Sequence, residues 1–238
     1  MPRQRRLEVN EATQNIIKAT ARQCMVEKGT AGLSLRAIAR QLKMTAPALY
    51  HYFTSLDELI TALIVDAFTA HANYVRHVRD ASAQVGEAPY RQLFAAIWAY
   101  RAWALENPID FQLIYGNPIP GYRAPAAVTV PAAGLMGELF MEILLAAIDA
   151  GELVLAEPYT IVPPTILAHY QSRFDKDTTM GPLFHVMNQM WSMIHGLVAL
   201  EIYHHLGPVV GDTDTFYRES VQVQLRSVGV QITQSALL

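Results

Sequence analysis

Charged residues and cysteine are both scarce in this sequence. Only 16% of the 238 residues are Asp, Glu, Lys or Arg, whereas 52% are hydrophobic. A chain of this length can bury a sizeable core, and so apolar a composition points to a surface that a partner or a ligand covers. The single cysteine, Cys24, excludes an intrachain disulfide, so we expect a reducing, cytoplasmic location.

Membrane and export signals are also missing. No run reaches the roughly 18–20 uncharged apolar residues that a membrane span needs, so we predict no membrane association. The N-terminus, MPRQRRLEVNE, is basic but has no apolar segment behind it. It therefore does not resemble a secretory signal.

The motifs of common enzymes are absent as well. The sequence has no G-x-S-x-G, no P-loop, no G-x-G-x-x-G and no H-E-x-x-H. His204 and His205 are adjacent, so on a helix their side chains point in different directions. We predict no enzyme, no catalytic or metal-binding residues and no cofactor. Two alternatives stay open: a helical metal or redox sensor using His169, His204 and His205, and a purely structural dimer.

The charges that are present are unevenly distributed. Residues 1–53 contain nine Lys or Arg and three acidic residues, which gives +6, whereas the remainder contains nine basic and eighteen acidic residues, which gives −9. A basic segment on an acidic chain indicates that this segment meets a polyanion.

Helical spacing dominates the sequence, and no convincing strand pattern with hairpin turns is present. Only GELVLAEP, beginning at Gly151, is ambiguous. Ser34 and Thr45 are suitable helix N-caps, and Ser55 with Glu58 forms a capping box. The fold class is therefore all-α. We predict helices at about 10–28, 35–42, 45–51, 55–80, 88–106, 132–150, 164–173, 180–206 and 213–232, with a Pro/Gly-rich loop at 116–131.

Residues 34–51 have the spacing of a helix-turn-helix. The second helix must enter a major groove about 12 Å wide, which requires small or polar residues on its exposed side. Leu42, Leu49 and Phe53 form the apolar side that packs inward.

The exposed side of this segment supplies the predicted DNA contacts. Tyr50 and His51 can donate to phosphate or to base edges, and the N-termini that follow Ser34 and Thr45 favour anions. Three arginines before the first predicted helix are interpreted as an arm that reaches a minor groove, with disorder as an equal alternative. The predicted DNA-binding residues are Arg3, Arg5, Arg6, Ser34, Arg36, Lys43, Thr45, Ala46, Pro47, Tyr50 and His51.

LSLRAIARQLKMTAPALYHYFTSLDEL resembles the signature of the TetR family of bacterial transcriptional repressors. The resemblance covers about residues 10–60 and includes the pairs Ile38–Ala39, Leu49–Tyr50 and Glu58–Leu59. It implies a homodimer with a DNA-binding domain at 1–54 and a ligand-binding and dimerisation domain at 55–238. In such proteins the position of Tyr50 touches phosphate, and those of Thr45, Ala46, Pro47 and His51 lie at or near base edges.

Two positions depart from the family pattern. Lys43 replaces the usual turn glycine. Leu56 replaces the usual lysine, which contacts phosphate, and its presence puts one backbone contact in doubt.

The later part resembles a TetR subgroup with a Trp-His-Gly element, here Trp191, His195 and Gly196. Gly196 within a helix indicates a close helix contact, at a dimer seam or a pocket wall. Pockets are mostly apolar with a few polar groups, and core packing uses the same residue types. We predict that an inducer of unknown identity contacts Trp98, Phe111, Tyr115, Met136, Phe140, Trp191 and His195.

The function predicted from these features is ligand-responsive transcriptional regulation. A homodimer formed through about 180–206 and 213–232 would bind a palindromic double-stranded operator as a repressor. A small, largely apolar molecule in the C-terminal bundle would release it through the long helix that begins near Ser55. An activator of the same family is the alternative.

Overall fold

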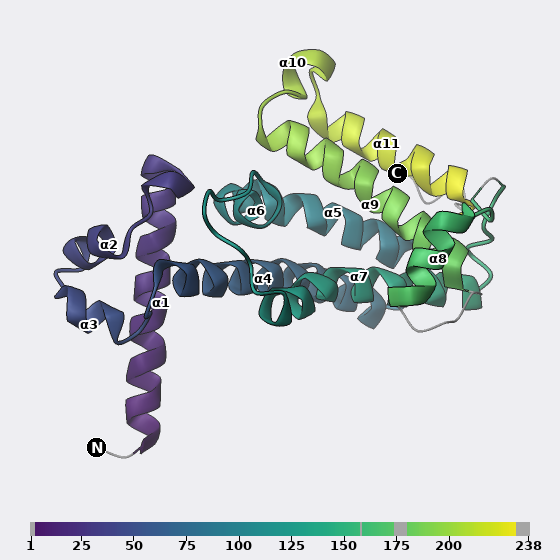
Figure 1. Cartoon of the computed structure of the whole chain (residues 1–238). Helices are drawn as coiled ribbons and strands as arrows, with labels where there is room; N and C mark the ends of the chain where they lie inside the picture. The colour runs from purple at the N-terminus through teal and green to yellow at the C-terminus, as the bar shows by residue number, and fades with distance from the viewer. Residues whose placement is uncertain (1–2, 158, 174–179, 232–238) are drawn as a thin grey trace. The chain divides into compact units, whose positions relative to one another are not determined.

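The computed structural model of the chain describes residues 3–157, 159–173 and 180–231 and confirms the all-helical fold class (Figure 1). The chain divides into two compact units. One comprises the residues up to Ala70 together with Asn107–Gly134, and the other comprises His71–Glu106 and the residues from Leu135 onward. The helices are α1 (Arg3–Lys28), η1 (Thr30–Gly32), α2 (Leu35–Gln41), α3 (Ala46–Tyr50), α4 (Leu56–Gln84), α5 (Pro89–Glu106), α6 (Pro108–Tyr115), α7 (Ala126–Asp149), α8 (Pro164–Arg173), α9 (Gly181–Ile202), α10 (Gly207–Val210) and α11 (Thr213–Val228).

The first unit has a core to which α1, α2, α3, the first turns of α4 and α6 all contribute. Ile17, Ile38, Leu49 and Leu59 are fully buried in it. Half-buried residues of the segment after α6, including Ile119, pack against the same core. The helix-turn-helix therefore shares its core with residues 70 positions further along the chain.

Ion pairs fasten α1 to two helices of this unit. Arg22 Nε donates to Asp110 Oδ1 at 2.8 Å and to Oδ2 at 3.0 Å, which joins α1 to α6. Lys18 Nζ lies 2.7 Å from Asp66 Oδ2, which joins α1 to α4. The Nε–H of Arg22 is thus shared between both oxygens of the Asp110 carboxylate, which gives a charge-assisted contact between α1 and α6.

In the second unit α5 packs on α9, and α9 on α11. A buried arginine at their junction, Arg101, meets two carboxylates: its Nε and Nη2 each lie 2.6 Å from an oxygen of Glu201, and Nη2 also lies 2.6 Å from Asp214 Oδ1. Burial alone would raise the pKa of the Glu201 carboxyl, but its hydrogen bonds with Arg101 and Thr213 outweigh burial and lower it. The guanidinium also lies over the rings of Trp98 and Tyr217.

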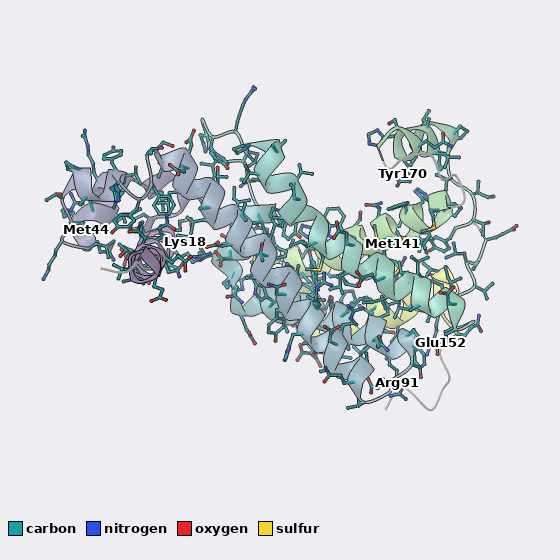
Figure 2. All side chains as sticks on the ribbon, turned by 90° about the horizontal axis from the view of Figure 1, so that it is seen from below. Lys18, Met44, Arg91, Met141, Glu152 and Tyr170 are labelled. Carbon is teal, nitrogen blue, oxygen red and sulfur yellow. The ribbon has the colours of Figure 1, made fainter. Side chains whose placement is uncertain are left out.

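The ambiguous GELVLAEP segment forms one short backbone pairing. Leu153 and Val230 make an isolated antiparallel bridge, and Val154 N donates to Gly229 O at 3.2 Å. Gly229 has φ 106°, and a Cβ there would lie 1.8 Å from the carbonyl oxygen of Val154, so only glycine fits. Glu152 Oε2 accepts a hydrogen bond from Tyr90 N at 2.9 Å, at the start of α5. Figure 2 labels Glu152 and Arg91, the residue that follows Tyr90.

Several predicted boundaries need correction. The helix α6 was not predicted, and the loop predicted at 116–131 ends where α7 begins, at Ala126. Pro131 lies inside α7, where it removes one backbone donor without ending the helix. The helix predicted to run to residue 206 ends at Ile202, and the last helix ends at Val228.

By length and composition α7 is apolar enough to cross a membrane. Its sequence contains three acidic residues, Glu138, Glu142 and Asp149, and Glu142 Oε2 lies 3.2 Å from Arg79 Nη2 of α4. One face of α7 is buried in the protein through Met136, Leu139 and Ile143. One face of α7 therefore belongs to the protein core, and its three acidic residues would have to be accommodated by a membrane span.

Candidate nucleic-acid interface

Both helices of the predicted helix-turn-helix are capped as expected. Ser34 Oγ accepts a hydrogen bond from Ala37 N at 3.1 Å, and Thr45 Oγ1 accepts one from Ala48 N at 3.3 Å. Pro47 lies in the first turn of α3, where its missing amide costs no hydrogen bond. The caps orient the free amides of α2 and α3 outward, where they favour an anion.

The turn between the two helices depends on a left-handed residue. Lys43 has φ 54°, and Met44 N donates to Ala39 O at 2.9 Å to close the end of α2. This conformation favours glycine and is strained for other residues. The lysine therefore carries a backbone cost and places an exposed cation between α2 and α3.

The two sides of α2 and α3 differ in the way that DNA binding requires. Ile38 and Leu49 are fully buried, and Phe53 is 4% exposed, so the apolar side packs inward as predicted. Ala46 is half-buried, and Arg40 is an exposed basic residue that the prediction omitted. The predicted contact residues on the outer side are exposed: Ser34, Arg36, Lys43, Thr45, Pro47, Tyr50 and His51. Their contacts with DNA stay a prediction.

The three N-terminal arginines were expected to precede the first helix, and this expectation is wrong. The helix α1 begins at Arg3, so the backbone of Arg3, Arg5 and Arg6 is helical. The sequence RQRRLE consists of good helix formers, which extend the amphipathic part of α1 toward the N-terminus. An extended arm into the minor groove is therefore not the form that this segment takes.

The start of α4 confirms the capping box in a modified form. Ser55 Oγ accepts from Glu58 N at 3.1 Å, while Glu58 Oε2 accepts from Thr54 N at 2.7 Å, one residue earlier than the standard pattern. Leu56, which replaces the family's lysine, packs against the core of the first unit. Its side chain therefore contributes apolar packing at the start of α4.

Comparisons with known proteins agree with this arrangement. Residues 17–63 match the family model described as bacterial regulatory proteins, tetR family, and residues 93–223 match the tetracyclin repressor-like C-terminal domain. The chain is 32% identical over 209 residues to the HTH-type transcriptional regulator Rv1816 of Mycobacterium tuberculosis, covering 85% of this chain and 86% of that protein. The chain belongs to the TetR family.

Solved structures of other proteins share the fold. The regulatory protein SCO4313 is 30% identical, with a TM-score of 0.72, and the match covers 95% of this chain and all of that chain. A tetR-family regulator from Rhodococcus RHA1 is 17% identical, with a TM-score of 0.63, and the match covers 91% and 97%. As a TetR-family member the chain is a helix-turn-helix, DNA-binding transcriptional regulator and not an enzyme.

The residues predicted to contact an inducer are divided between the two units. Phe111 is buried and Tyr115 half-buried in the first unit, where both rings pack together and Tyr115 meets Phe68 edge-on. Trp98, Met136, Phe140, Trp191 and His195 belong to the second unit. No member of this set lines either of the two clefts described below. Their role as ligand contacts stays a prediction.

The second unit contains a buried imidazole cluster around Tyr100. The ring of His71 stacks on Trp103 at 4.2 Å, and its Nε2 donates to the carbonyl oxygen of Tyr100 at 3.2 Å. The Tyr100 hydroxyl is 3.0 Å from His195 Nδ1. Burial lowers the pKa of His71 to about 3, so this ring is neutral at pH 7. Burial also lowers the pKa of the half-buried His195.

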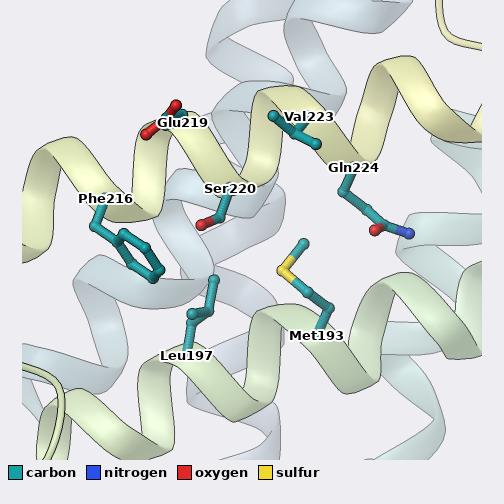
Figure 3. Close-up of a pocket in the computed structure, with 7 residues that line it drawn as sticks. All are labelled: Met193, Leu197, Phe216, Glu219, Ser220, Val223 and Gln224. Atoms are coloured by element: carbon teal, nitrogen blue, oxygen red, sulfur yellow. The ribbon is translucent and has the colours of Figure 1, made fainter. Parts of the chain in front are cut away.

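A groove runs between α9 and α11 on the surface of the second unit (Figure 3). Leu197 and Met193 rise from α9, and Phe216 and Val223 from α11, with the polar Ser220 between them. Gly196 also lies on α9, but the close contact expected there is not made within the described chain, since a Cβ would have nothing within 4 Å.

The first unit contains a cleft of about 390 Å³ that the sequence analysis did not predict. Ile64 and Phe68 of α4, Ile114 of α6, residues 116–124 and the start of α7 line it. The signal was present in GNPIPGYRAP, but which helices this segment faces depends on the tertiary fold.

Proposed function

We propose that this TetR-family protein is a homodimeric repressor of the cytoplasm that binds a palindromic operator and is released by a small, largely apolar molecule. The observation that carries the proposal is the two-sided α2–α3 segment. Its inner side is anchored by buried Leu49 and Phe53, and its outer side presents capped helix N-termini, small residues and exposed Arg36 and Lys43. Such a surface suits a major groove and its flanking phosphates.

Dimerisation through α9 and α11 is supported by the apolar residues on their exposed faces. Leu200 of α9 is 45% exposed and Val223 of α11 is 58% exposed. Together with the groove between these two adjacent helices, they form an apolar surface of the kind that a second copy covers in a four-helix seam. Gly196, open on the same helix, would allow the second backbone to approach closely. A two-fold dimer would place the recognition helices about 34–36 Å apart, or somewhat more.

Release by an inducer is the second half of the proposal. The molecule binds in the helical bundle and favours a conformation in which the two recognition helices no longer match the operator spacing. Moving the population from mostly bound to mostly free requires about 5.5 kcal/mol of differential affinity. Trp191, His195 and Gly196 support placing the chain in the Trp-His-Gly subgroup.

The sensor alternative finds less support. Within residues 3–157, 159–173 and 180–231, no group of three or more His, Cys, Asp or Glu is arranged to hold a metal ion. Cys24 is buried and lies 3.3 Å from Gln41 Oε1, which is a position for an inert thiol. No observation on the described chain favours activation over repression.

Selection of bound fragments from genomic DNA tests the proposal. The purified protein is incubated with sheared DNA of its source, and the retained fragments are sequenced. We expect one enriched palindrome, with half-sites about one helical turn apart or somewhat more. Retention without any enriched motif would overturn sequence-specific regulation.

A further inference from the structure

The outer side of α1 carries a row of residues with the spacing of a two-helix seam. Its members alternate three and four residues apart along the helix and are Val9, Ala12, Ile16, Ala19, Gln23 and Val26. This is the spacing of the a and d positions of a heptad repeat, which keep to one side of a helix and meet a second helix there. At about 1.5 Å per residue, the row is about 25 Å long.

The row is exposed although it is mostly apolar. All six side chains are exposed, and the exposed fractions of Ile16 and Val26 are 55% and 60%. The core of the first unit takes the opposite side of α1, where Ile17, Ala21 and Cys24 are buried. The row is therefore apolar surface that this unit does not use in its own core, and such surface gains free energy when another apolar surface covers it.

The positions that border the middle of the row carry no charge. On one side, Thr13 Oγ1 donates to Val9 O at 2.8 Å. Thr20 Oγ1 donates to Ile16 O at 2.9 Å in the same way, so the protons of both hydroxyls are used within α1. The uncharged Asn15 borders the other side. A second helix can therefore cover the middle of the row without removing an ion from water.

The order of side chains along the row identifies a second copy of α1 as its partner. If two copies run antiparallel about a two-fold axis, Ile16 faces Ala19 of the second copy. Ala12 faces Gln23 in the next layer, and the valines at the two ends of the row face each other. A large side chain thus meets a small one in each of the middle layers, which fills the space between two helices evenly. The same pairs recur on both sides of the axis, as an isologous contact requires.

The charges at the ends of α1 favour the antiparallel direction. Glu8 and Glu11 lie near its beginning, whereas Lys28 balances Glu27 in its last turn. Two parallel copies would bring the acidic residues beside their own counterparts, and they would also leave a gap where Ala12 meets Ala12. Antiparallel copies place the acidic beginning of one helix beside the neutral last turn of the other, and their helix dipoles are opposed.

We propose that the outer side of α1 pairs with the same side of α1 from a second copy, as an antiparallel seam centred between Ile17 and Lys18. One pair of helices of this length buries less than the roughly 1,200 Å² of a stable interface, so the seam is weak in free solution. It joins copies that one DNA molecule already holds close together. The seam stands on α1 alone, whereas this effect on DNA binding rests on the function proposed above.

Disulfide trapping of the full chain tests the seam and its direction together. Ile16→Cys and Ala19→Cys are prepared as separate variants, and each is oxidised alone and in an equal mixture. A disulfide needs Cα atoms within about 7 Å, and only antiparallel copies bring position 16 that close to position 19. We therefore expect linked chains in the mixture, in at least tenfold greater yield than with either variant alone. The native Cys24 is buried and is the same in every sample.

Val85→Cys provides the background for this experiment, because Val85 is an exposed valine outside α1. Its mixture with Ala19→Cys measures linkage by random collision. Linkage of the Ile16→Cys and Ala19→Cys mixture at this background level would overturn the seam. Efficient linkage of Ile16→Cys with itself would overturn its antiparallel direction.

The effect on DNA binding is measured separately, on duplexes that carry two selected palindromes at a series of distances. At one distance or more, we expect the unaltered chain to bind the second palindrome at least tenfold more tightly than a single one. Ile16→Glu should lose this gain and keep its affinity for one palindrome, whereas Val85→Glu should keep both. An equal mixture of Ile16→Glu and Ala19→Lys should recover the gain, because opposite charges then face each other across the seam.

The outcomes of the two experiments separate the seam from its consequence. Disulfide trapping without any gain on paired palindromes would refute the effect on DNA and leave the seam in place. A gain that survives in Ile16→Glu would show that it does not arise from α1. Absence of any selected palindrome would count against the proposed function, while disulfide trapping would still decide the seam.

Discussion

The exposed face of α2–α3 and the exposed face of α9–α11 differ in what they leave to solvent. The first presents cations, hydroxyls and small side chains over buried Leu49, whereas the second presents Leu200, Val223 and the apolar groove between the two helices. A face of the first kind is stable in water and gains energy from a polyanion, and one of the second kind gains it from another apolar surface. The contrast shows that the solvent exposure of a face does not by itself indicate its partner. The type of side chain that is exposed, charged or apolar, indicates it.

The largest expected effect is on stability, at the Arg101 ion pair that joins α5, α9 and α11. Arg101→Leu should lower the free energy of unfolding by about 3 kcal/mol, because it leaves the half-buried carboxylate of Glu201 without its partner. The same change in the exposed Arg36→Leu should cost under about 0.5 kcal/mol. Urea denaturation at one fixed protein concentration measures both. Equal losses would mean that Arg101 does not carry the junction of α5, α9 and α11.

A charge on the apolar face should separate the proposed dimer. Val223→Glu places a carboxylate at the groove, and we expect a monomer whose operator affinity falls by about a hundredfold, since the two half-sites are no longer bound together. Val209→Glu is the matched control, because Val209 is 82% exposed on α10 and does not line the groove. Light scattering gives the mass and anisotropy the affinity. A dimeric Val223→Glu would place the seam elsewhere.

On the DNA face, Tyr50→Phe should weaken binding about tenfold by removing one hydrogen bond to phosphate. Because phosphate contacts carry no sequence information, the affinities for operator and for scrambled DNA should fall by the same factor. Competition binding with both DNAs measures this loss. A changed preference between them would show that Tyr50 reads a base.

The neighbouring His51 and Thr45 should behave in the opposite way. His51→Ala should alter the preference among operator variants, and so should Thr45→Ser, which retains the cap of α3. Binding profiles over a library of single-base operator variants provide the comparison. Unaltered profiles would exclude base contacts at both positions.

The smallest effect compares two left-handed residues. Lys43 has φ 54° and His204 φ 59°, so glycine at either position should raise the free energy of unfolding by up to about 1 kcal/mol. Only Lys43→Gly should also reduce the salt dependence of DNA binding, by about one phosphate contact. Thermal unfolding and salt titration separate the two effects. Loss of salt dependence in His204→Gly would contradict the assignment of the DNA face to α2–α3.

Local sequence chemistry was enough to predict the helix-turn-helix. Ser34, Thr45 and the spacing of Ile38, Leu49 and Phe53 determine caps and an apolar side within a few residues, and the structure confirms both. Lys43 in the turn was noticed as a departure, and its positive φ shows that the backbone keeps the geometry that glycine would favour.

Proline was the main source of error in the rest. No helix was predicted between residues 106 and 132, but Pro108 lies in the first turn of α6, where proline is tolerated. Pro131 was assigned to a loop, although the packing of Ala132 and Met136 holds α7 together around it. Proline lacks an N–H and so leaves one backbone carbonyl without its helical partner. Whether the helix nevertheless continues through the proline depends on the tertiary packing around it.

The cleft could not be predicted because its contacts join distant positions. Tyr122 meets Thr61 across 61 residues, and Asp110 meets Arg22 across 88. Periodicity assigns residues to a side of one helix but gives no information about which helices are neighbours. The predicted set of inducer contacts was consequently chosen by residue type, and its members lie in both units of the chain.

Fluorescence anisotropy with the selected palindrome, against a scrambled duplex at several salt concentrations, tests the central claim most directly. The account predicts that the palindrome binds at least about a thousandfold more tightly than the scrambled duplex, with a steep loss of affinity as salt rises. Equal and weak binding of both duplexes at every salt concentration would contradict it, because α2–α3 would then not be a sequence-reading surface.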